Sequence, residues 1–257
     1  MTATSGSPTA LGEGVSPGIT VVVAAYDEEA CVADVVAAVP AEVCGLGTEV
    51  LVVDDGSGDA TADNAEAAGA LVARMPVNVG QGAALRAGYR IAAERGARII
   101  ATTDADGQLD PRQLPALVAP ILDGRADLVT GSRRLGTNHN RDAARSTGIV
   151  VFAGLLSVLT GRRVTDPSNG LRAWRREVTD TVDLRQAQYQ TAELLLRATA
   201  AGFRHAEVAV TVAPRAAGET KKGSTLRYGA RFTRAVLTTW WQLRHHGGGA
   251  GAGRPRG

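Results

Sequence analysis

The chain has 257 residues, of which 44% are hydrophobic, and its 28 Lys and Arg against 26 Asp and Glu give a formal net charge of +2. This length and hydrophobic content can fill one large α/β domain or two small ones, and the nearly balanced charge gives no reason to expect nucleic acid as a partner. Two cysteines, Cys31 and Cys44, and the lack of a signal-peptide pattern argue against a disulfide framework and favour a cytoplasmic location.

Both ends of the chain have compositions that predict disorder. Residues 1–18 are rich in Ser, Gly, Pro and Thr, and residues 247–257 form a Gly/Ala/Arg/Pro tail. Neither segment offers enough apolar surface to offset the entropy of ordering it. We therefore expect one folded domain over residues 19–223, a helix over residues 224–246, and a disordered tail on either side.

Two Val-rich runs near the start predict buried strands that end in acidic turns. The first covers residues 20–25, and the second covers residues 49–53 and leads into two aspartates. Apolar residues then recur at helical spacing over residues 32–39 and 84–92. Strands that alternate with helices predict a mostly parallel, twisted central sheet flanked by helices, with ligands bound beyond the carboxyl ends of the strands.

A dinucleotide-binding Rossmann fold is the rival interpretation of this alternation, and it needs a Gly-x-Gly-x-x-Gly turn after the first strand. Here that turn contains Asp27 and Glu28, which repel a bare pyrophosphate but suit the hydrogen-bond donors of a nucleobase and a ribose. For Asp54 and Asp55, capping of the following helix is the structural alternative. The glycines of residues 80–82 either permit close helix–strand packing or leave room for a ligand, and packing is slightly favoured.

A third strand end carries the most informative run of the chain. An apolar stretch over residues 99–102 leads into Asp104, Asp106 and Gln108 at alternating positions. Alternation along a strand points their oxygens the same way. Hard oxygen ligands in this place suit Mg2+ or Mn2+ that also holds a diphosphate. A solvated Asp-Gly turn is the alternative, but three acidic strand ends at one edge of a sheet favour the metal site.

The second half of the chain supplies positive charge. Residues 128–133 predict a strand that ends in Arg133, whose planar guanidinium is suited to phosphate. A further strand over residues 205–212 leads into a basic loop over residues 215–224. The alternative for this loop is an ordinary solvated basic segment.

The last predicted helix combines cations with aromatic residues. Three arginines share one of its faces, and two tryptophans follow them: Arg227, Arg231, Arg234, Trp240 and Trp241. Such a helix either lies on an anionic membrane surface, as a peripheral contact, or packs on its own domain or on a second subunit in a homodimer. The longest apolar run, residues 149–159, is too short to span a bilayer.

In this order and spacing, the segments over residues 19–241 resemble the family 2 glycosyltransferases, which have the GT-A fold. They are most similar to the branch of polyprenyl-phosphate (dolichol-phosphate) mannosyl- or glucosyltransferases. The resemblance implies a nucleotide-diphospho-sugar donor, bound by residues of the acidic edge and the basic loop: Ala24, Tyr26, Glu28, Asp54, Asp55, Asp104, Ala105, Arg215 and Lys221. It also implies that Asp104, Asp106 and Gln108 hold Mg2+ or Mn2+.

The same resemblance implies roles on the acceptor side. Asp106, Arg133 and Asp166 would be catalytic, and acceptor binding would fall to Arg133, Arg145 and Ser146. A surface salt bridge explains Arg145 equally well. The basic loop resembles the family's Arg-x-x-Gly-x-Ser-Lys lid, which closes over phosphates, although a Thr replaces the usual Ser here and a second Lys follows.

Residues 165–173 resemble the family's Val-x-Asp-x-x-Ser-Gly-Phe-Arg segment, with two mild departures. Asp166 would face the acceptor as a base or as an orienting group, or would simply form an Asp-Pro turn. Many family members that act on sugar hydroxyls carry a Glu-Asp pair whose Asp removes the proton, whereas Leu194 follows Glu193 here. A phosphate acceptor is already ionised and needs no base. The missing Asp therefore favours a phosphate acceptor, and Glu193 is interpreted as structural or as orienting the lid.

These observations predict a metal-dependent, inverting enzyme that moves a hexose from a GDP- or UDP-sugar to a polyprenyl phosphate at the cytosolic membrane face. A transferase acting on a sugar or small-molecule hydroxyl, with Asp166 as its base, is the nearest alternative. A nucleotide-sugar-binding protein without transferase activity is the second, and the intact acidic trio and basic loop argue against it.

Overall fold

The computed structural model describes residues 17–139, 143–214 and 225–246, without the side chains of residues 143–147, 225–228 and 246. The strands are β1 (Ile19–Ala25), β2 (Glu42–Val43), β3 (Leu46–Asp54), β4 (Leu71–Arg74), β5 (Ile99–Asp104), β6 (Leu128–Asn138), β7 (Arg172–Arg175) and β8 (His205–Val212). The helices are α1 (Val32–Ala37), α2 (Thr61–Ala67), α3 (Gln81–Glu94), α4 (Leu114–Leu122), α5 (Ala143–Thr160), α6 (Arg176–Thr181), α7 (Gln190–Ala200) and α8 (Thr225–His246), with a short 3-10 helix at Pro111–Gln113. Apart from residues 17 and 18, the predicted tails lie outside the described residues.

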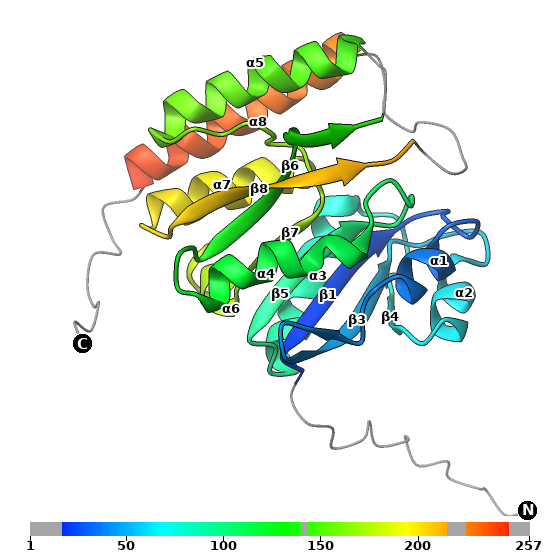
Figure 1. Ribbon diagram of the computed structural model, residues 1–257. Helices are drawn as coiled ribbons and strands as arrows, with labels where there is room; N and C mark the ends of the chain where they lie inside the picture. Colours follow the sequence, from blue (N-terminus) through cyan, green and yellow to red (C-terminus); the bar gives the residue numbers. More distant parts are fainter. Residues whose placement is uncertain (1–16, 140–142, 215–224, 247–257) are drawn as a thin grey trace, which may run out of the picture.

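These strands form one sheet in the order β2-β3-β1-β5-β7-β6-β8, with β4 paired to β3 (Figure 1). Strand β1 is parallel to β3 and β5, β3 is parallel to β4, and β6 is parallel to β8. The predicted α/β architecture with a mostly parallel sheet is therefore confirmed. Two strands depart from it: β2 pairs antiparallel with β3, and the four-residue β7 runs antiparallel between β5 and β6.

Helices cover both faces of the sheet, and successive side chains of β1 show how. Val21 and Val23 pack in the core shared with α1, α2 and α4, whereas Val22 packs in the core shared with α3, α5, α7 and α8. A strand buried on both faces needs a continuous apolar run, which is why the Val-rich pattern identified β1. On the second face α3 approaches closely, because a Cβ added at Gly88 would lie within 3.1 Å of Val53 Cγ2.

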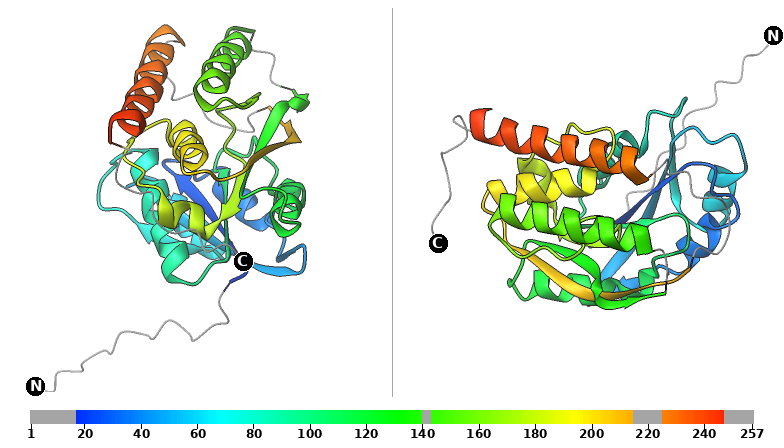
Figure 2. Two further views of the ribbon diagram at one scale, coloured as in Figure 1. Left: turned by 90° about the vertical axis from the view of Figure 1, so that its left-hand side faces the viewer. Right: turned by 90° about the horizontal axis from the view of Figure 1, so that it is seen from above.

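The helices α5 and α8 run alongside each other over α7, at the outer edge of the second layer (Figures 1 and 2). The rings of Phe152 on α5 and Phe232 on α8 lie 4.1 Å apart, centroid to centroid. Gln186 Nε2 donates to Thr239 Oγ1 on α8 at 3.2 Å, so α8 is also tied to the loop that precedes α7. Over the ranges that the structure describes, no helix combines the length and the apolar character needed to cross a membrane.

Candidate functional site

Three strand ends meet at one edge of the sheet. In the parallel register, Ala25 at the end of β1 pairs with Asp54 at the end of β3, and Ala24 pairs with Asp104 at the end of β5. Parallel strands place their carboxyl ends together, and this is where open α/β sheets bind ligands. The structure therefore brings the predicted acidic strand ends to a single acidic edge.

The turn after β1 is fastened to the turn after β3. Asp27 adopts a left-handed backbone, with φ of +49°, and its Oδ1 accepts the Gly58 N–H at 3.0 Å. The Glu28 N–H donates to Thr61 Oγ1 at 2.8 Å. Tyr26, a predicted donor-binding residue, is 37% exposed in this turn and can contact a ligand that lies over the edge.

Asp54 and Asp55 both hold backbone amides in place. Asp55 accepts the N–H groups of Val79 and Gly80, each at 2.9 Å, and Asp54 Oδ1 accepts the Ser57 N–H at 3.1 Å. Neither carboxylate caps α2, because the Thr61 N–H at its start donates to Asp59 instead. The two aspartates shape the loops around the edge, and a nucleotide can use only their remaining lone pairs.

Asp106 and Gln108 follow Asp104 in a turn rather than along a continued strand. Strand β5 ends at Asp104, Gly107 has φ of +71°, and Asp106 Oδ1 accepts the Gln108 N–H at 3.1 Å. Asp106 and Gln108 are each 9% exposed. The expectation of three oxygens aligned along one strand is corrected, because β5 ends at Asp104 and the turn that follows, with a left-handed Gly107, lacks the extended geometry that alternation requires.

The donor set of this turn fits a hard divalent cation. No three His, Cys, Asp or Glu side chains gather as a metal cluster in the described part of the chain, so two carboxylates and the Gln108 amide are what the turn offers. Mg2+ and Mn2+ prefer such oxygen ligands, and an ion that these three groups held would keep open positions for diphosphate oxygens.

Arg133, on β6, is held by Asp166. Arg133 Nε donates to Asp166 Oδ2 at 2.6 Å, and the backbone N–H of Arg133 donates to the same oxygen at 3.1 Å. The two side chains are 8% and 0% exposed. Only Nε of the guanidinium is used in this contact, so its two Nη groups remain as donors for a phosphate.

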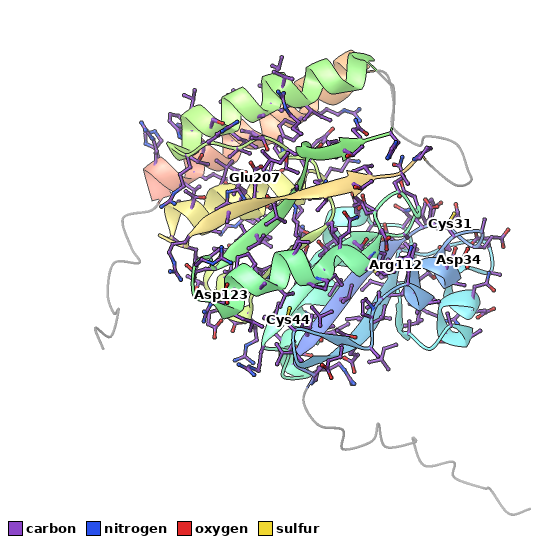
Figure 3. All side chains as sticks on the ribbon, viewed as in Figure 1. Cys31, Asp34, Cys44, Arg112, Asp123 and Glu207 are labelled. Atoms are coloured by element: carbon purple, nitrogen blue, oxygen red, sulfur yellow. The ribbon has the colours of Figure 1, made fainter. Side chains whose placement is uncertain are left out.

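Asp166 is placed in turn by Glu207 on β8, which is labelled in Figure 3. Glu207 accepts the backbone N–H groups of Thr165 at 2.9 Å and of Asp166 at 3.0 Å, and the Thr165 hydroxyl at 2.7 Å. The Thr165 and Ser132 hydroxyls lie 2.6 Å apart. This network joins β6, β8 and the loop before β7, and no local sequence pattern predicts it.

Arg172, the first residue of β7, is 1% exposed. Its guanidinium donates to three backbone carbonyls, those of Asn169 at 2.7 Å, Thr191 at 2.5 Å and Pro167 at 3.0 Å. Burial lowers the pKa of Arg172 to about 10, although Tyr89 and nearby carboxylates oppose the shift. Arg172 is therefore still a cation at neutral pH. In the sequence, an arginine within a short apolar segment was the signal that could have identified it as a functional or structural residue, because charged residues are seldom fully buried.

Glu193 and Gly82, for which the sequence favoured structural roles, both make structural contacts. Glu193 is 2% exposed and accepts the Gln186 N–H and Arg197 Nε, both at 2.8 Å, which agrees with its structural interpretation. A Cβ added at Gly82 would lie 2.6 Å from the Ala187 carbonyl carbon. Gly82 therefore permits close packing of α3, as the sequence favoured. The segment packed against it is the loop before α7, and not a strand as expected.

Several predicted residues lie outside what the structure describes. Arg215 and Lys221 of the basic loop fall in the undescribed range 215–224, and the side chains of Arg145 and Ser146 on α5 are not described either. Their roles stay predictions from the sequence.

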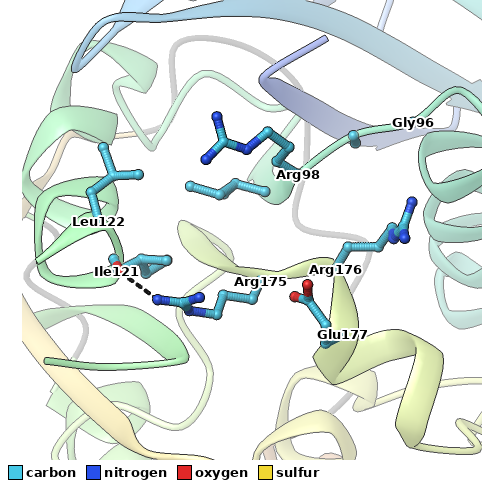
Figure 4. Close-up of a pocket in the computed structure, with 9 residues that line it drawn as sticks. Gly96, Arg98, Ile121, Leu122, Arg175, Arg176 and Glu177 are labelled. Carbon is cyan, nitrogen blue, oxygen red and sulfur yellow. Dashed lines mark hydrogen bonds between the residues drawn. The ribbon is translucent and has the colours of Figure 1, made fainter. Parts of the chain in front are cut away.

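A cavity of about 280 Å3 lies at the opposite end of β5 from Asp104 (Figure 4). Ile99, the first residue of β5, pairs there with Arg175. Figure 4 shows the side chains of Arg98 and Arg175 on different sides of the hollow. None of the predicted site residues lines this cavity, so the acidic edge remains the candidate site.

Comparison with known proteins gives a family match and curated relatives. A family model described as "Glycosyl transferase family 2" matches residues 20–183. An uncharacterized glycosyltransferase of Mycobacterium tuberculosis is 37% identical over 209 residues, which are 81% of this chain and 91% of the relative. An undecaprenyl-phosphate mannosyltransferase of Micrococcus luteus is 34% identical, over 68% of this chain and 75% of the relative. A dolichyl-phosphate hexose transferase of Haloferax volcanii is also 34% identical, over 79% and 86%.

Solved structures give a further comparison. Glucosyl-3-phosphoglycerate synthase from Mycobacterium tuberculosis, in complex with Mn2+, UDP and phosphoglyceric acid, superposes with a TM-score of 0.66 and 27% identity, covering 89% of this chain and 78% of that one. The same enzyme with Mg2+ and UDP gives a TM-score of 0.66 and 26% identity, over 93% and 83%. The predicted GT-A fold is confirmed.

Proposed function

The chain belongs to glycosyl transferase family 2, and from this premise we propose that it transfers a hexose from a GDP- or UDP-sugar to a polyprenyl phosphate, with inversion and with Mg2+ or Mn2+ as cofactor. The observation that carries the proposal is the buried pair of Arg133 and Asp166. Asp166, the acceptor-side carboxylate that could have served as a base, binds Arg133 instead. The Nη groups of Arg133 are left as donors for a phosphate.

The donor side of the proposal rests on the acidic edge. Asp104, Asp106 and Gln108 would hold the cation, because two carboxylates and an amide suit it and the turn keeps Asp106 and Gln108 together. When bound, the ion supplies positive charge to the diphosphate leaving group. Tyr26 and Glu28 would contact the nucleoside from the turn after β1. Solved relatives carrying Mn2+ or Mg2+ with UDP support this arrangement.

The acceptor side of the proposal rests on the contacts that the Asp166 and Glu193 carboxylates make within the protein. A hydroxyl acceptor needs a base within hydrogen-bond reach, whereas a phosphate is ionised near neutral pH. Asp166 is fully buried against Arg133, and Glu193 holds the backbone of the loop before α7. We therefore assign Asp166 to orienting Arg133, and Arg133 to bridging the donor and acceptor phosphates.

Two relatives are named for transfer to polyprenyl phosphates, which supports the lipid acceptor. The solved structures compared above are of an enzyme named for glucosyl-3-phosphoglycerate synthesis, and one of them contains phosphoglyceric acid. A small phosphorylated hydroxy acid is therefore the second candidate acceptor, and Arg133 could bind its phosphate in the same place.

We propose that the outer surfaces of α5 and α8, called here the α5–α8 face, contact the inner surface of the cell membrane. Five apolar residues of this face are exposed by 42 to 81%: Val150, Val151, Val158, Leu237 and Trp241. Arg231, Arg234 and Arg244 add cations, and neither helix contains Asp or Glu. Apolar and cationic groups without acids suit an anionic lipid surface. A second copy of the chain is the alternative occupant.

The test is a transfer assay with purified protein, labelled GDP-mannose or UDP-glucose, and Mn2+. A short-chain polyprenyl phosphate, phosphoglyceric acid and a free sugar are offered separately. We expect label in an acid-labile glycolipid and none when EDTA is in excess. Preferential labelling of phosphoglyceric acid or of the sugar would reject the lipid acceptor, and labelling that survives EDTA would reject the metal.

A further inference from the structure

One short loop touches both halves of the proposed site. Residues 166–170 lead into β7, with Asp166 bound to Arg133 at one end and Gly170 against Asp104 at the other. We propose that Gly170 and Arg172 are positioning residues: Gly170 fixes the place of the metal-binding carboxylate, and Arg172 holds the loop that sets Asp104 and Arg133 relative to each other. This inference rests on the proposed function.

Gly170 is required by space rather than by backbone conformation. Gly170 does not have a positive φ, so its backbone does not require glycine. A Cβ added there, however, would lie 2.5 Å from Cγ and 2.6 Å from Oδ2 of Asp104. Real Cβ atoms essentially never come closer than 3.0 Å to such a neighbour. The Gly170 carbonyl also accepts the Thr102 hydroxyl at 2.7 Å, which ties the loop to β5 two residues before Asp104. Any side chain at position 170 must move the Asp104 carboxylate or the loop.

Arg172 holds the same loop from the other side. Its Nε and Nη2 bind the carbonyls of Asn169 and Pro167, and its Nη1 binds the carbonyl of Thr191 at the start of α7. Three carbonyls in three directions need the planar guanidinium fork, which the single ammonium of lysine cannot reproduce. The segment between Asp166 and Gly170 is thereby fixed to α7 as well as to the sheet.

This arrangement has a consequence for catalysis beyond stability. The cation would sit on Asp104 and the acceptor phosphate on Arg133, so their separation depends on one loop of five residues. Reacting groups must be aligned closely, and a displacement of about 1 Å can lower a rate by about 100-fold. Gly170 and Arg172 touch neither substrate, and they act through Asp104 and Arg133.

The first experiment compares Gly170→Ala with Gly47→Ala. Gly47 lies at the amino end of β3, and a Cβ there meets no atom within 4 Å. Binding of Mn2+ in the presence of UDP or GDP is measured by electron paramagnetic resonance of the free ion, beside circular dichroism. We expect Gly170→Ala to keep the fold, to weaken Mn2+ binding by about 10-fold or more, and to regain transfer partly at high Mn2+, with Gly47→Ala unchanged. Mn2+ affinity and transfer equal to wild type in folded Gly170→Ala would overturn the role of Gly170.

The second experiment uses Arg172→Lys, which keeps the charge, and remains informative if Gly170→Ala fails to fold. We expect kcat to fall by about 100-fold, with a KM for the acceptor that rises and a weaker Mn2+ complex, because both ends of the loop shift together. Full activity of Arg172→Lys would overturn the inference. A different result would reject the proposed function and keep the role of Gly170: wild type that transfers to no phosphate acceptor, together with a Gly170→Ala variant that still loses Mn2+ binding.

Discussion

Arg133 Nε and Asp166 Oδ2 form a 2.6 Å charged hydrogen bond between side chains that are 8% and 0% exposed. Removing two charges from water costs nearly as much as their attraction returns, so such a pair adds little stability over apolar residues of the same volume. Its geometry is therefore better explained by the need to aim a guanidinium than by the need to stabilise the domain.

Replacing Asp166 by Asn should separate these two effects. The variant keeps an oxygen for Arg133 but leaves its buried charge uncompensated, so the free energy of unfolding should fall by about 3–5 kcal/mol in urea titrations. Transfer to the phosphate acceptor should fall as well. In the double variant Asp166→Asn/Arg133→Met, stability should recover in part and activity should not. A double variant as active as wild type would remove Arg133 from the acceptor site.

Asp106→Asn should abolish transfer while the fold stays intact. Asn retains an oxygen that can accept the Gln108 N–H, so the turn is preserved, but an anionic ligand for the cation is lost. A ligand at about 100 times its dissociation constant stabilises a protein by about 2.7 kcal/mol. The increase in melting temperature that Mn2+ with nucleotide gives wild type should therefore vanish in the variant. Undiminished turnover in Asp106→Asn would remove it from the metal site.

The basic loop offers a test independent of the described residues. Arg215→Ala or Lys221→Ala should each cost about 2–4 kcal/mol of transition-state stabilisation, the scale of losing one preorganised charge partner. Donor with Mn2+ should also protect the segment from proteolysis if it closes over the phosphates. Loss of stability alone, with kcat unchanged, would support an ordinary basic loop.

Membrane contact through the α5–α8 face should depend on charge. Wild type should bind vesicles containing anionic lipid more weakly as salt increases, and replacing Arg227, Arg231 and Arg234 together with Gln should reduce binding in a sedimentation assay. Arg90→Gln, in an exposed pair with Glu94 on α3, serves as the control. Equal vesicle binding by the triple variant, or a dimer that hides the face in solution, would point to the second copy instead.

His205 predicts a pH dependence of stability. Burial lowers the pKa of His205 to about 4, with Arg172 and Arg162 acting in the same direction, from an ordinary value of 6.5. The unfolded chain then binds the proton more readily, so stability is fully present above about pH 6.5 and decreases as pH falls towards 4. The difference amounts to roughly 3 kcal/mol. In His205→Gln, urea titrations between pH 4 and 7 should lose that part of the slope, and an unchanged slope would assign it to other groups.

The sequence predicted what depends on local pattern. Val-rich runs identified β1 and β3, an apolar run at residues 99–102 identified β5, and parallel pairing then required their acidic ends to meet. It did not predict β7, because a four-residue strand containing Arg172 has too short an apolar pattern. Nor did it predict the contact of Glu207 with Asp166, which spans 41 positions in the chain and depends on which strands become neighbours. The alternation expected over Asp104, Asp106 and Gln108 was wrong for a local reason, since β5 ends at Asp104 and a turn follows it.

The position of β7 also bears on the order in which a growing chain can assemble. Strand β7 fills the gap between β5 and β6, although it is made after both of them. Until residues 166–170 have left the ribosome, Asp104 lacks its contact with Gly170 and Arg133 lacks the Asp166 carboxylate. The amino-terminal strands can pair early, because domains tend to fold from the amino end during synthesis. A nascent chain that stops before Gly170 would thus leave unpaired the edges of β5 and β6 that β7 joins in the folded sheet, and unpaired strand edges of this kind are prone to aggregate.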